Sequence, residues 1–373
     1  MIDLATARET FETSVDGTVG VEEEYAILDP SSLLLVPEYV RLNAAGQQDP
    51  VLAESLSGEL ISSEIEIRSG RGEDLSHALS LQADARRRLL ALARAEGLIL
   101  GSTGTHPLSD YRDQTLIDTE HYRRVGEGLQ YVAWRNNTFS VHLHVGVQGG
   151  DRAVAVCDRL RPILPTLLAL SANSPYLDQR DSGLHSARTQ MFTKSFPRCG
   201  VPEPFGDWAT WADYVELLIR TGSIVEFTQL WWSIRPHHSF GTVEVRICDA
   251  QSTVRETEAL SALIVGCVHA AMREVDAGLP VRNVPGRLIE ENVWRAIRNG
   301  MDGKLLTIES DTIDEIPAGT AVERLAAWAG VAPDFPEHNG AQRQRRRIES
   351  GMSPYDVYAE TVSQTNETPQ EVT

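Results

Sequence analysis

The chain has 373 residues, 42% of them hydrophobic, which is long enough for one large domain or two ordinary ones and for a substantial buried core. Its 34 lysines and arginines against 53 aspartates and glutamates give a formal net charge of -19, which would repel nucleic acid and anionic membranes over most of the surface. The four cysteines lack CxxC spacing, and no signal-peptide core or membrane-length apolar run occurs, so we expect a protein of the reducing cytoplasm.

The order of the predicted elements is typical of an α+β domain. Apolar residues that recur every three or four positions predict amphipathic helices over 74–96, 150–172, 210–221, 255–277 and 286–299. Period-two alternation predicts strands over 18–28, 59–68, 138–147 and 241–248, with a shorter one over 97–102. We predict one catalytic domain over 17–361, a flexible N-terminus over 1–16 and a flexible polar tail over 362–373.

Residues 173–208 stand apart because they are rich in proline and glycine and show little periodicity. An irregular stretch of this length is usually functional or disordered. Its aromatic residues, together with Arg180, Arg188, Lys194 and Arg198, favour an ordered lid or binding loop.

Four of the predicted strands have an unusual polar face. Period two places these residues on it, strand by strand: Glu22 and Glu24; Ser62, Glu64, Glu66 and Arg68; His142 and His144; Glu244 and Arg246. An antiparallel sheet with one face in water alternates in the same way, so no single strand decides the matter. Several aligned carboxylates, however, repel one another unless a cation lies between them. Together the strands favour a site for one or more divalent metals.

Carboxylate oxygens with an occasional imidazole suit Mg²⁺ or Mn²⁺. Zinc is less favoured, because only the pair His142 and His144 supports it. Magnesium combined with arginine suits phosphoryl transfer, yet the chain contains no GxxxxGK[ST] loop. If this protein uses ATP, the nucleotide must bind on a sheet.

Seven segments, in order, resemble the carboxylate-amine ligase (YbdK-like) branch of the glutamate-cysteine ligase type 2 family. They are GVEEEY (20–25), ELISSEIEI (59–67), GTHP (104–107), HLHVGV (142–147), LSANSPY (170–176), SARTQMF (186–192) and IRPHHSFGTVEVRICD (234–249). The resemblance implies a glutamine synthetase-like fold, with a curved antiparallel β-sheet and helices on its convex face. It also implies an ATP-dependent reaction in which the γ-carboxylate of glutamate becomes an acyl phosphate and an amine, usually cysteine, displaces phosphate.

The resemblance also implies roles for particular residues. Metal ligands would be Glu22, Glu24, Glu66, Glu244 and His144; catalytic contacts would come from Arg246, Arg235 and His144; ATP would be bound by Arg188, Arg246 and Lys194. The partners would be small molecules, namely glutamate or a related carboxylate and cysteine or another amine, with no nucleic acid and no membrane. The amine, the number of metal ions and any homo-oligomer stay open.

Two residues depart from the family pattern. Glu64 adds a carboxylate and Arg68 follows where a small residue is more usual, so together they would form an ion pair or change substrate choice. Two other functions also stay open: a metal-dependent hydrolase of γ-glutamyl or acyl amides, and a non-catalytic nucleotide-binding protein on the same scaffold. For His106, His185, Trp231 and Trp232 a structural role is the favoured interpretation, as is a solvated helix face for 343–347.

Overall fold

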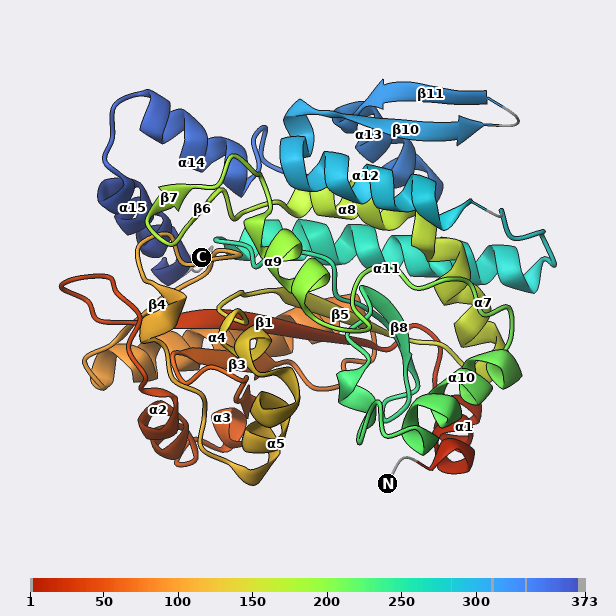
Figure 1. Cartoon of the computed structure of the whole chain (residues 1–373), viewed down its shortest axis with the longest axis horizontal. Helices are drawn as coiled ribbons and strands as arrows, with labels where there is room; N and C mark the ends of the chain where they lie inside the picture. Colours follow the sequence, from red (N-terminus) through yellow and green to blue (C-terminus); the bar gives the residue numbers. More distant parts are fainter. Residues whose placement is uncertain (1–2, 283, 310–311, 333, 368–373) are drawn as a thin grey trace.

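A seven-stranded sheet runs through the centre of the molecule (Figure 1). The computed structural model describes residues 3–282, 284–309, 312–332 and 334–367. Its strands are β1 (Val19–Leu28), β2 (Leu56–Ser57), β3 (Glu64–Arg68), β4 (Ile99–Gly101), β5 (Val141–Gly146), β8 (Ile234–His237) and β9 (Thr242–Val245). They follow the order β2-β3-β1-β5-β9-β8, β4 also pairs with β1, and every pairing is antiparallel. The predicted α+β class with an antiparallel sheet is confirmed.

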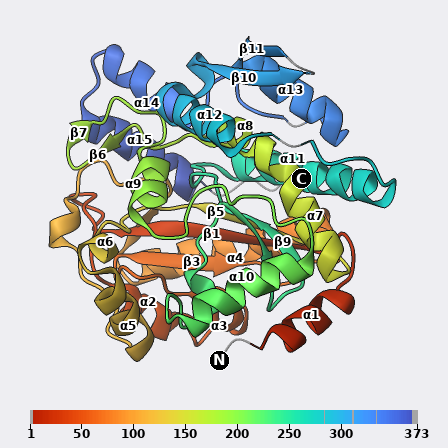
Figure 2. The same cartoon turned by 45° about the vertical axis from the view of Figure 1, so that its right-hand side comes forward.

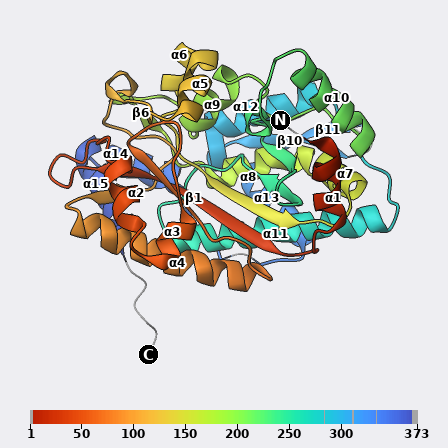
Figure 3. The same cartoon turned by 90° about the horizontal axis from the view of Figure 1, so that it is seen from below.

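Helices cover one face of this sheet. Figure 3 shows α4 (Leu75–Ala95) and α11 (Val254–Asp276) lying together on one side of β1. Further helices pack on or beside α11, namely α7 (Gly150–Leu160), α8 (Leu164–Ser171), α12 (Gly286–Asn299) and α13 (Ala318–Ala329). All five predicted amphipathic helices are present, and α7 and α8 divide the predicted helix 150–172 at a proline-containing turn, Arg161–Ile163.

The apolar positions of the strands form the core on this helix side. Tyr25 and Ile65 pack with Leu89 of α4 in one buried group, while Leu143 and Val243 belong to a larger group with residues of α7 and α11. Because successive side chains of a strand point to opposite faces, the intervening polar residues are turned away from these helices. The fold therefore presents the polar residues on the opposite face, which the remaining elements surround.

The other elements form the rim and the outer parts of the molecule (Figure 2). The helices are α1 (Leu4–Glu12), α2 (Tyr39–Gly46), α3 (Pro50–Ser55), α5 (Glu120–Leu129), α6 (Tyr131–Trp134), α9 (Ala187–Ser195), α10 (Trp208–Arg220), α14 (Gly340–Glu349) and α15 (Pro354–Asn366). Two hairpins complete the fold: β6 (Tyr176–Leu177) with β7 (Arg180–Asp181), and β10 (Lys304–Glu309) with β11 (Thr312–Pro317). Within the described ranges, no helix combines the length and apolar character needed to cross a membrane.

Both predicted flexible ends are partly wrong. Asp3 caps the N-terminus of α1, and Phe11 is fully buried against Trp208 with 5.5 Å between ring centroids, so the first residues belong to the core. At the other end, α15 continues to Asn366 and buries Val362 and Thr365. The predicted tail residues 368–373 lie outside the described part of the chain.

Residues 173–208 are more regular than predicted. They contain the β6-β7 hairpin and helix α9, whose N-cap Ser186 accepts a hydrogen bond from the Thr189 amide. The sequence did not predict helix α9, because polar residues interrupt its short apolar pattern. The segment is ordered, and its predicted function as a lid stays a prediction.

Candidate active site

The strand register brings the four polar faces together. Across β1 and β5, Glu22 lies opposite His142, and across β1 and β3, Glu24 lies opposite Glu66. Across β5 and β9, His144 lies opposite Glu244. Residues from four separate strands therefore meet on one surface, as the alternation predicted.

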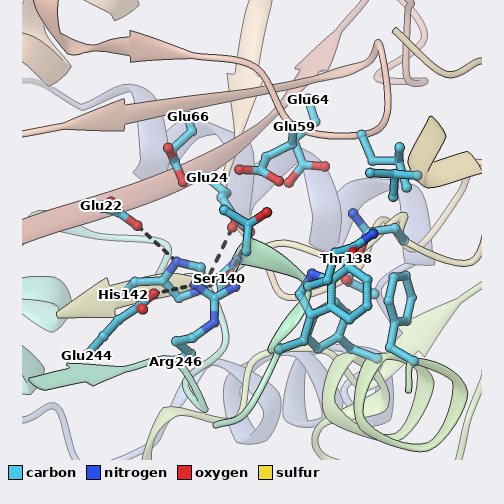
Figure 4. A pocket seen from close by; sticks show the side chains of 18 of the residues that line it. Glu22, Glu24, Glu59, Glu64, Glu66, Thr138, Ser140, His142, Glu244 and Arg246 are labelled. Carbon is cyan, nitrogen blue, oxygen red and sulfur yellow. Dashed lines mark hydrogen bonds and ion pairs between the residues drawn. The ribbon is translucent and has the colours of Figure 1, made fainter. Parts of the chain in front are cut away.

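These side chains line a cleft of about 210 Å³ (Figure 4). One part is acidic and contains Glu22, Glu24, Glu59, Glu64, Glu66 and Glu244. The other part is apolar, with Leu60, Val125, Phe192, Phe196 and Trp231. Phe192 and Phe196 come from α9 and the residue after it, so the segment predicted as a binding loop does border the cleft.

Three overlapping groups of donor atoms in the cleft have the chemistry of metal ligands. They are Glu22, Glu66 and His142; Glu22, His144 and Glu244; and Glu24, Glu59 and Glu66, with one donor atom from each residue lying within 4.8 Å of the others in its group. Predominantly carboxylate donors fit Mg²⁺ or Mn²⁺. All five predicted metal ligands are members of these groups.

The surroundings of His144 and Glu24 support this fit. The Nδ1 atom of His144 lies 2.9 Å from Oγ1 of Thr242, while its buried Nε2 has no hydrogen-bond partner in the described ranges and lies 3.4 Å from Glu22 Oε1. A ring held on one nitrogen and open on the other is the usual arrangement of a ligating histidine. Ser140 donates from its amide (2.5 Å) and its hydroxyl (2.6 Å) to Glu24 Oε2, which orients that carboxylate.

Two arginines lie beside the donor groups and form ion pairs with Glu244. Arg235 donates from Nε to Glu244 Oε2 at 2.5 Å, and Nη1 donates to the Leu230 carbonyl at 2.6 Å. Arg246 also pairs with Glu244, and its buried Nε has no hydrogen-bond partner among the described residues. Both guanidinium groups therefore border the proposed metal positions, where arginine can donate hydrogen bonds to phosphate or carboxylate oxygens.

Three acidic groups of the cleft resist ionisation. Burial raises the pKa of Glu59 to about 7, with a further contribution from the charge of Glu24. Burial and the neighbouring carboxylates also raise the pKa values of Glu64 and Glu66 well above their usual range. A cation bound beside such carboxylates would favour their ionised form.

Two other carboxylates have the opposite tendency. Burial alone would raise the pKa of Glu22, but His144 and His142 lower it well below its usual range. Burial opposes ionisation of Glu244 as well, and Arg235 and Arg246 lower its pKa despite it. The cleft thus shifts the pKa values of neighbouring carboxylates in opposite directions, a separation common at catalytic and metal sites.

Arg188 and Lys194, both predicted to bind ATP, have different surroundings. Buried Arg188 lines the cleft, but its Nη1 and Nη2 atoms donate to the carbonyls of Ile247 (3.0 Å) and Arg246 (3.2 Å). Lys194 is exposed, is absent from the cleft lining and pairs with Glu290 of α12. The helical period of α9 turns Lys194 away from the cleft that Arg188 and Phe192 line, so its predicted role in ATP binding gains no support from this cleft and stays a prediction.

The predicted pairing of Glu64 with Arg68 is wrong. Arg68 donates from Nε to Glu66 Oε1 at 2.5 Å and lies 3.6 Å from Glu22 Oε1. Glu64 keeps a buried carboxylate oxygen, Oε2, without a hydrogen-bond partner among the described residues.

Three residues of the site were left out of the predicted metal set. Ser140 and His142 belong to the polar face that period two assigns to His144, and Glu59 begins the second acidic segment. The alternation could therefore have indicated the first two. No sequence signal indicates that Leu60, Trp231 and the α9 aromatics meet at the same cleft.

The lone histidines have structural contacts, as predicted. Buried His106 hydrogen-bonds the Leu33 carbonyl and the Ser109 amide. His185 lies against Gly300, with Nε2 3.6 Å from Asp302. Trp232 is a core residue and Trp231 lines the cleft rim, whereas Arg343, Arg345 and Arg347 form ion pairs instead of a freely solvated face.

Solved structures with the same fold define the class of this protein. It superposes on glutamate-cysteine ligase from Francisella tularensis in complex with AMP, with a TM-score of 0.65 and 13% identity over 95% of this chain and 90% of that chain. A bifunctional glutathione synthetase from Pasteurella multocida gives a TM-score of 0.66 and 11% identity over 97% of this chain, which spans about half (53%) of that chain. The fold is that of the glutamate-cysteine ligases.

The sequence comparisons name the family. The model of glutamate-cysteine ligase family 2 matches residues 18–371. A Rubrobacter xylanophilus protein provisionally named glutamate-cysteine ligase 2-2 is 40% identical over 86% of this chain and 82% of its own length. Glutamate-cysteine ligase of Natronomonas pharaonis is 33% identical over 94% of this chain and 95% of its own length. The chain belongs to glutamate-cysteine ligase family 2 and is a carboxylate-amine ligase.

Proposed function

We propose that this protein is an ATP-dependent ligase that joins the γ-carboxylate of glutamate to an amine through an acyl phosphate. The observation that carries the proposal is the set of three overlapping donor groups on one sheet face, bordered by Arg235 and Arg246. Divalent ions bound there would neutralise the triphosphate and hold it in line with the carboxylate.

The residues of the cleft have separable roles in this reaction. Glu22, Glu24, Glu66, Glu244 and His144 hold the metal ions. Arg246 and Arg235 stabilise charge on the transferred phosphoryl group or hold a substrate carboxylate, as bidentate donors suited to both. Arg188 positions Arg246, because its guanidinium donates to the main chain at the end of β9.

Water must be kept from the acyl phosphate, since hydrolysis would waste ATP. The apolar wall of Phe192, Phe196 and Trp231 lies across the cleft from the carboxylates and is suited to that task. Cysteine is the amine in the names of the relatives, and we propose at least weak activity with it.

The experiment is a coupled ADP-release screen of glutamate and related carboxylates against a panel of amines, with Mg²⁺ and Mn²⁺ in parallel. We expect ADP release that requires the metal, glutamate and an amine together. Cleavage of γ-glutamyl amides with metal alone would instead identify a hydrolase, and nucleotide binding without turnover would identify a non-catalytic protein.

A further inference from the structure

Among the carboxylates that line the cleft, Glu64 has a buried oxygen atom without a hydrogen-bond partner in the described part of the chain. It begins β3 opposite Ala26 of β1, so its cross-strand neighbour offers no charge or hydrogen bond. Only 1% of the residue is exposed, and its Oε2 atom is buried without a hydrogen-bond partner among the described residues. A buried polar atom in this state is costly, which indicates that something outside the chain completes it.

Other residues of the cleft already supply the ligands that a metal ion would need. Glu22, Glu66 and Glu244 each pair with an arginine or histidine, and Glu24 accepts two hydrogen bonds from Ser140. These four carboxylates make up the three donor groups together with Glu59, His142 and His144, and Glu64 belongs to none of them. Glu64 is thus an additional carboxyl group in the same cleft as the proposed metal positions.

The apolar wall lies in the same cleft. The rings of Phe192 and Phe196 are 4.7 Å apart, and those of Phe196 and Trp231 are 5.5 Å apart. Leu60, which directly follows Glu59, packs with Val125 and Trp231 and so joins the acidic part of the cleft to the wall. A cleft that combines a carboxylate with aromatic faces suits an organic cation with an apolar chain, since both attract ammonium groups.

We propose that Glu64 binds a second, unreactive ammonium group of the amine substrate, whose methylene chain packs on Leu60, Phe196 and Trp231. This inference rests on the proposed function and names its amine class: diamines are preferred to monoamines of equal length. In the reaction, the free amino group forms the C–N bond with the acyl carbon, and the C–O bond to phosphate breaks. The nitrogen loses one of its protons to the displaced phosphate and keeps the other as the amide hydrogen. The second ammonium keeps its proton throughout.

The experiment compares each diamine with the monoamine in which a methyl group replaces the second ammonium, beginning with 1,4-diaminobutane and 1-aminopentane and extending to the longer pairs. The measured quantity is the ratio of kcat/KM values, with ATP, Mg²⁺ and glutamate fixed. We expect wild-type protein to prefer at least one diamine by about tenfold or more, as hydrogen bonds to charged groups allow. Glu64→Gln should reduce that ratio to near one.

A matched control removes a different carboxylate of the same cleft. Glu226 lies at its rim, where it pairs with His121, so Glu226→Gln should keep the diamine preference. Glu64→Met, which replaces the carboxylate by an apolar side chain of similar size, serves as a second variant, and calorimetric titration with 1,4-diaminobutane gives a readout independent of turnover. Both Glu64 variants should lose that binding.

The outcomes separate this inference from the proposed function. Hydroxylamine traps an acyl phosphate as a hydroxamate whatever the natural amine is, so glutamate hydroxamate formed by wild-type protein tests the ligase chemistry alone. Hydroxamate formation without a diamine preference, or with a preference that survives in both Glu64 variants, would overturn the inference. Absence of hydroxamate would overturn the proposed function itself.

Discussion

Two consecutive glutamates of β1, Glu23 and Glu24, show how differently the two faces of the sheet treat a buried acid. Glu23 points to the helices, where Arg86 (3.1 Å), Gln82 (3.0 Å) and Thr257 (2.9 Å) complete its carboxylate. Glu24 points to the cleft among carboxylates whose charge the chain compensates only in part. The helix side supplies Glu23 with a neutralising arginine and two further donors, whereas the cleft side gathers carboxylates that a bound cation would neutralise.

Removal of cleft carboxylates should have the largest effect on turnover. Glu24→Gln and Glu244→Gln each take one charge from a metal donor group while keeping the side-chain shape, so we expect ADP release to fall by at least about 10²-fold. Circular dichroism should stay close to wild type in both variants, and so should thermal unfolding of Glu24→Gln, whereas Glu244→Gln leaves buried Arg235 without its anion and should also unfold at a lower temperature. Unchanged rates in both variants would contradict the placement of the site.

The opposite pattern should follow from Glu23→Gln. It leaves Arg86, which is 3% exposed, without its anion, and the expected loss is about 3–5 kcal/mol in the free energy of unfolding. Denaturant titration measures that loss, and turnover per folded molecule should persist. The double variant Glu23→Leu/Arg86→Met is the control, because replacing both partners should recover most of the stability; a single variant as stable as wild type would mean that the network contributes little.

The pH dependence of stability should also separate the two faces. Because the folded pKa of Glu59 is raised to about 7, its contribution to stability is complete below its unfolded pKa and is lost as pH rises through about 7. With one pKa unit equal to about 1.4 kcal/mol, the metal-free protein should lose on the order of 3 kcal/mol between about pH 4.5 and about pH 7, and little more at higher pH. Thermal melts should show this loss, and Mg²⁺ should reverse it more strongly at the higher pH. A melting temperature that rises with pH in this window would argue against a raised pKa of Glu59.

The smallest effect is expected for Lys194→Ala. Its ion pair with Glu290 is exposed, and pairs of this kind contribute about 0–1 kcal/mol. Turnover and the KM for ATP should change less than about twofold, within what loss of an exposed ion pair allows. A tenfold rise in the KM for ATP would instead show that Lys194 contributes to nucleotide binding.

Residue alternation was enough to predict the sheet and to place most of the proposed metal ligands on one of its faces. Period two determines which face of a strand a side chain occupies, so Glu22, Glu24, His144 and Glu244 could be assigned to one surface before their register was known. The helices that cover the other face could also be predicted, from apolar residues that recur every three or four positions.

Other features depend on contacts between distant segments. Glu23 could not be placed in a polar network from the sequence, because its partners Arg86 and Thr257 lie far away in the sequence. The outward direction of Lys194 follows from a helix that had no periodic signal, and the order of the N-terminus from burial of Phe11 against Trp208. Such pairings are decided by tertiary packing, which a single sequence does not display.

Titration with Mn²⁺ tests most directly whether the cleft face, and not the helix face, is built for a cation. Calorimetry on wild type, Glu244→Gln and the Glu23→Leu/Arg86→Met double variant gives the three dissociation constants. We predict saturable binding in wild type, the same affinity in the double variant and an affinity about tenfold or more weaker in Glu244→Gln. Absence of saturable binding, or equal affinity in wild type and Glu244→Gln, would contradict the account.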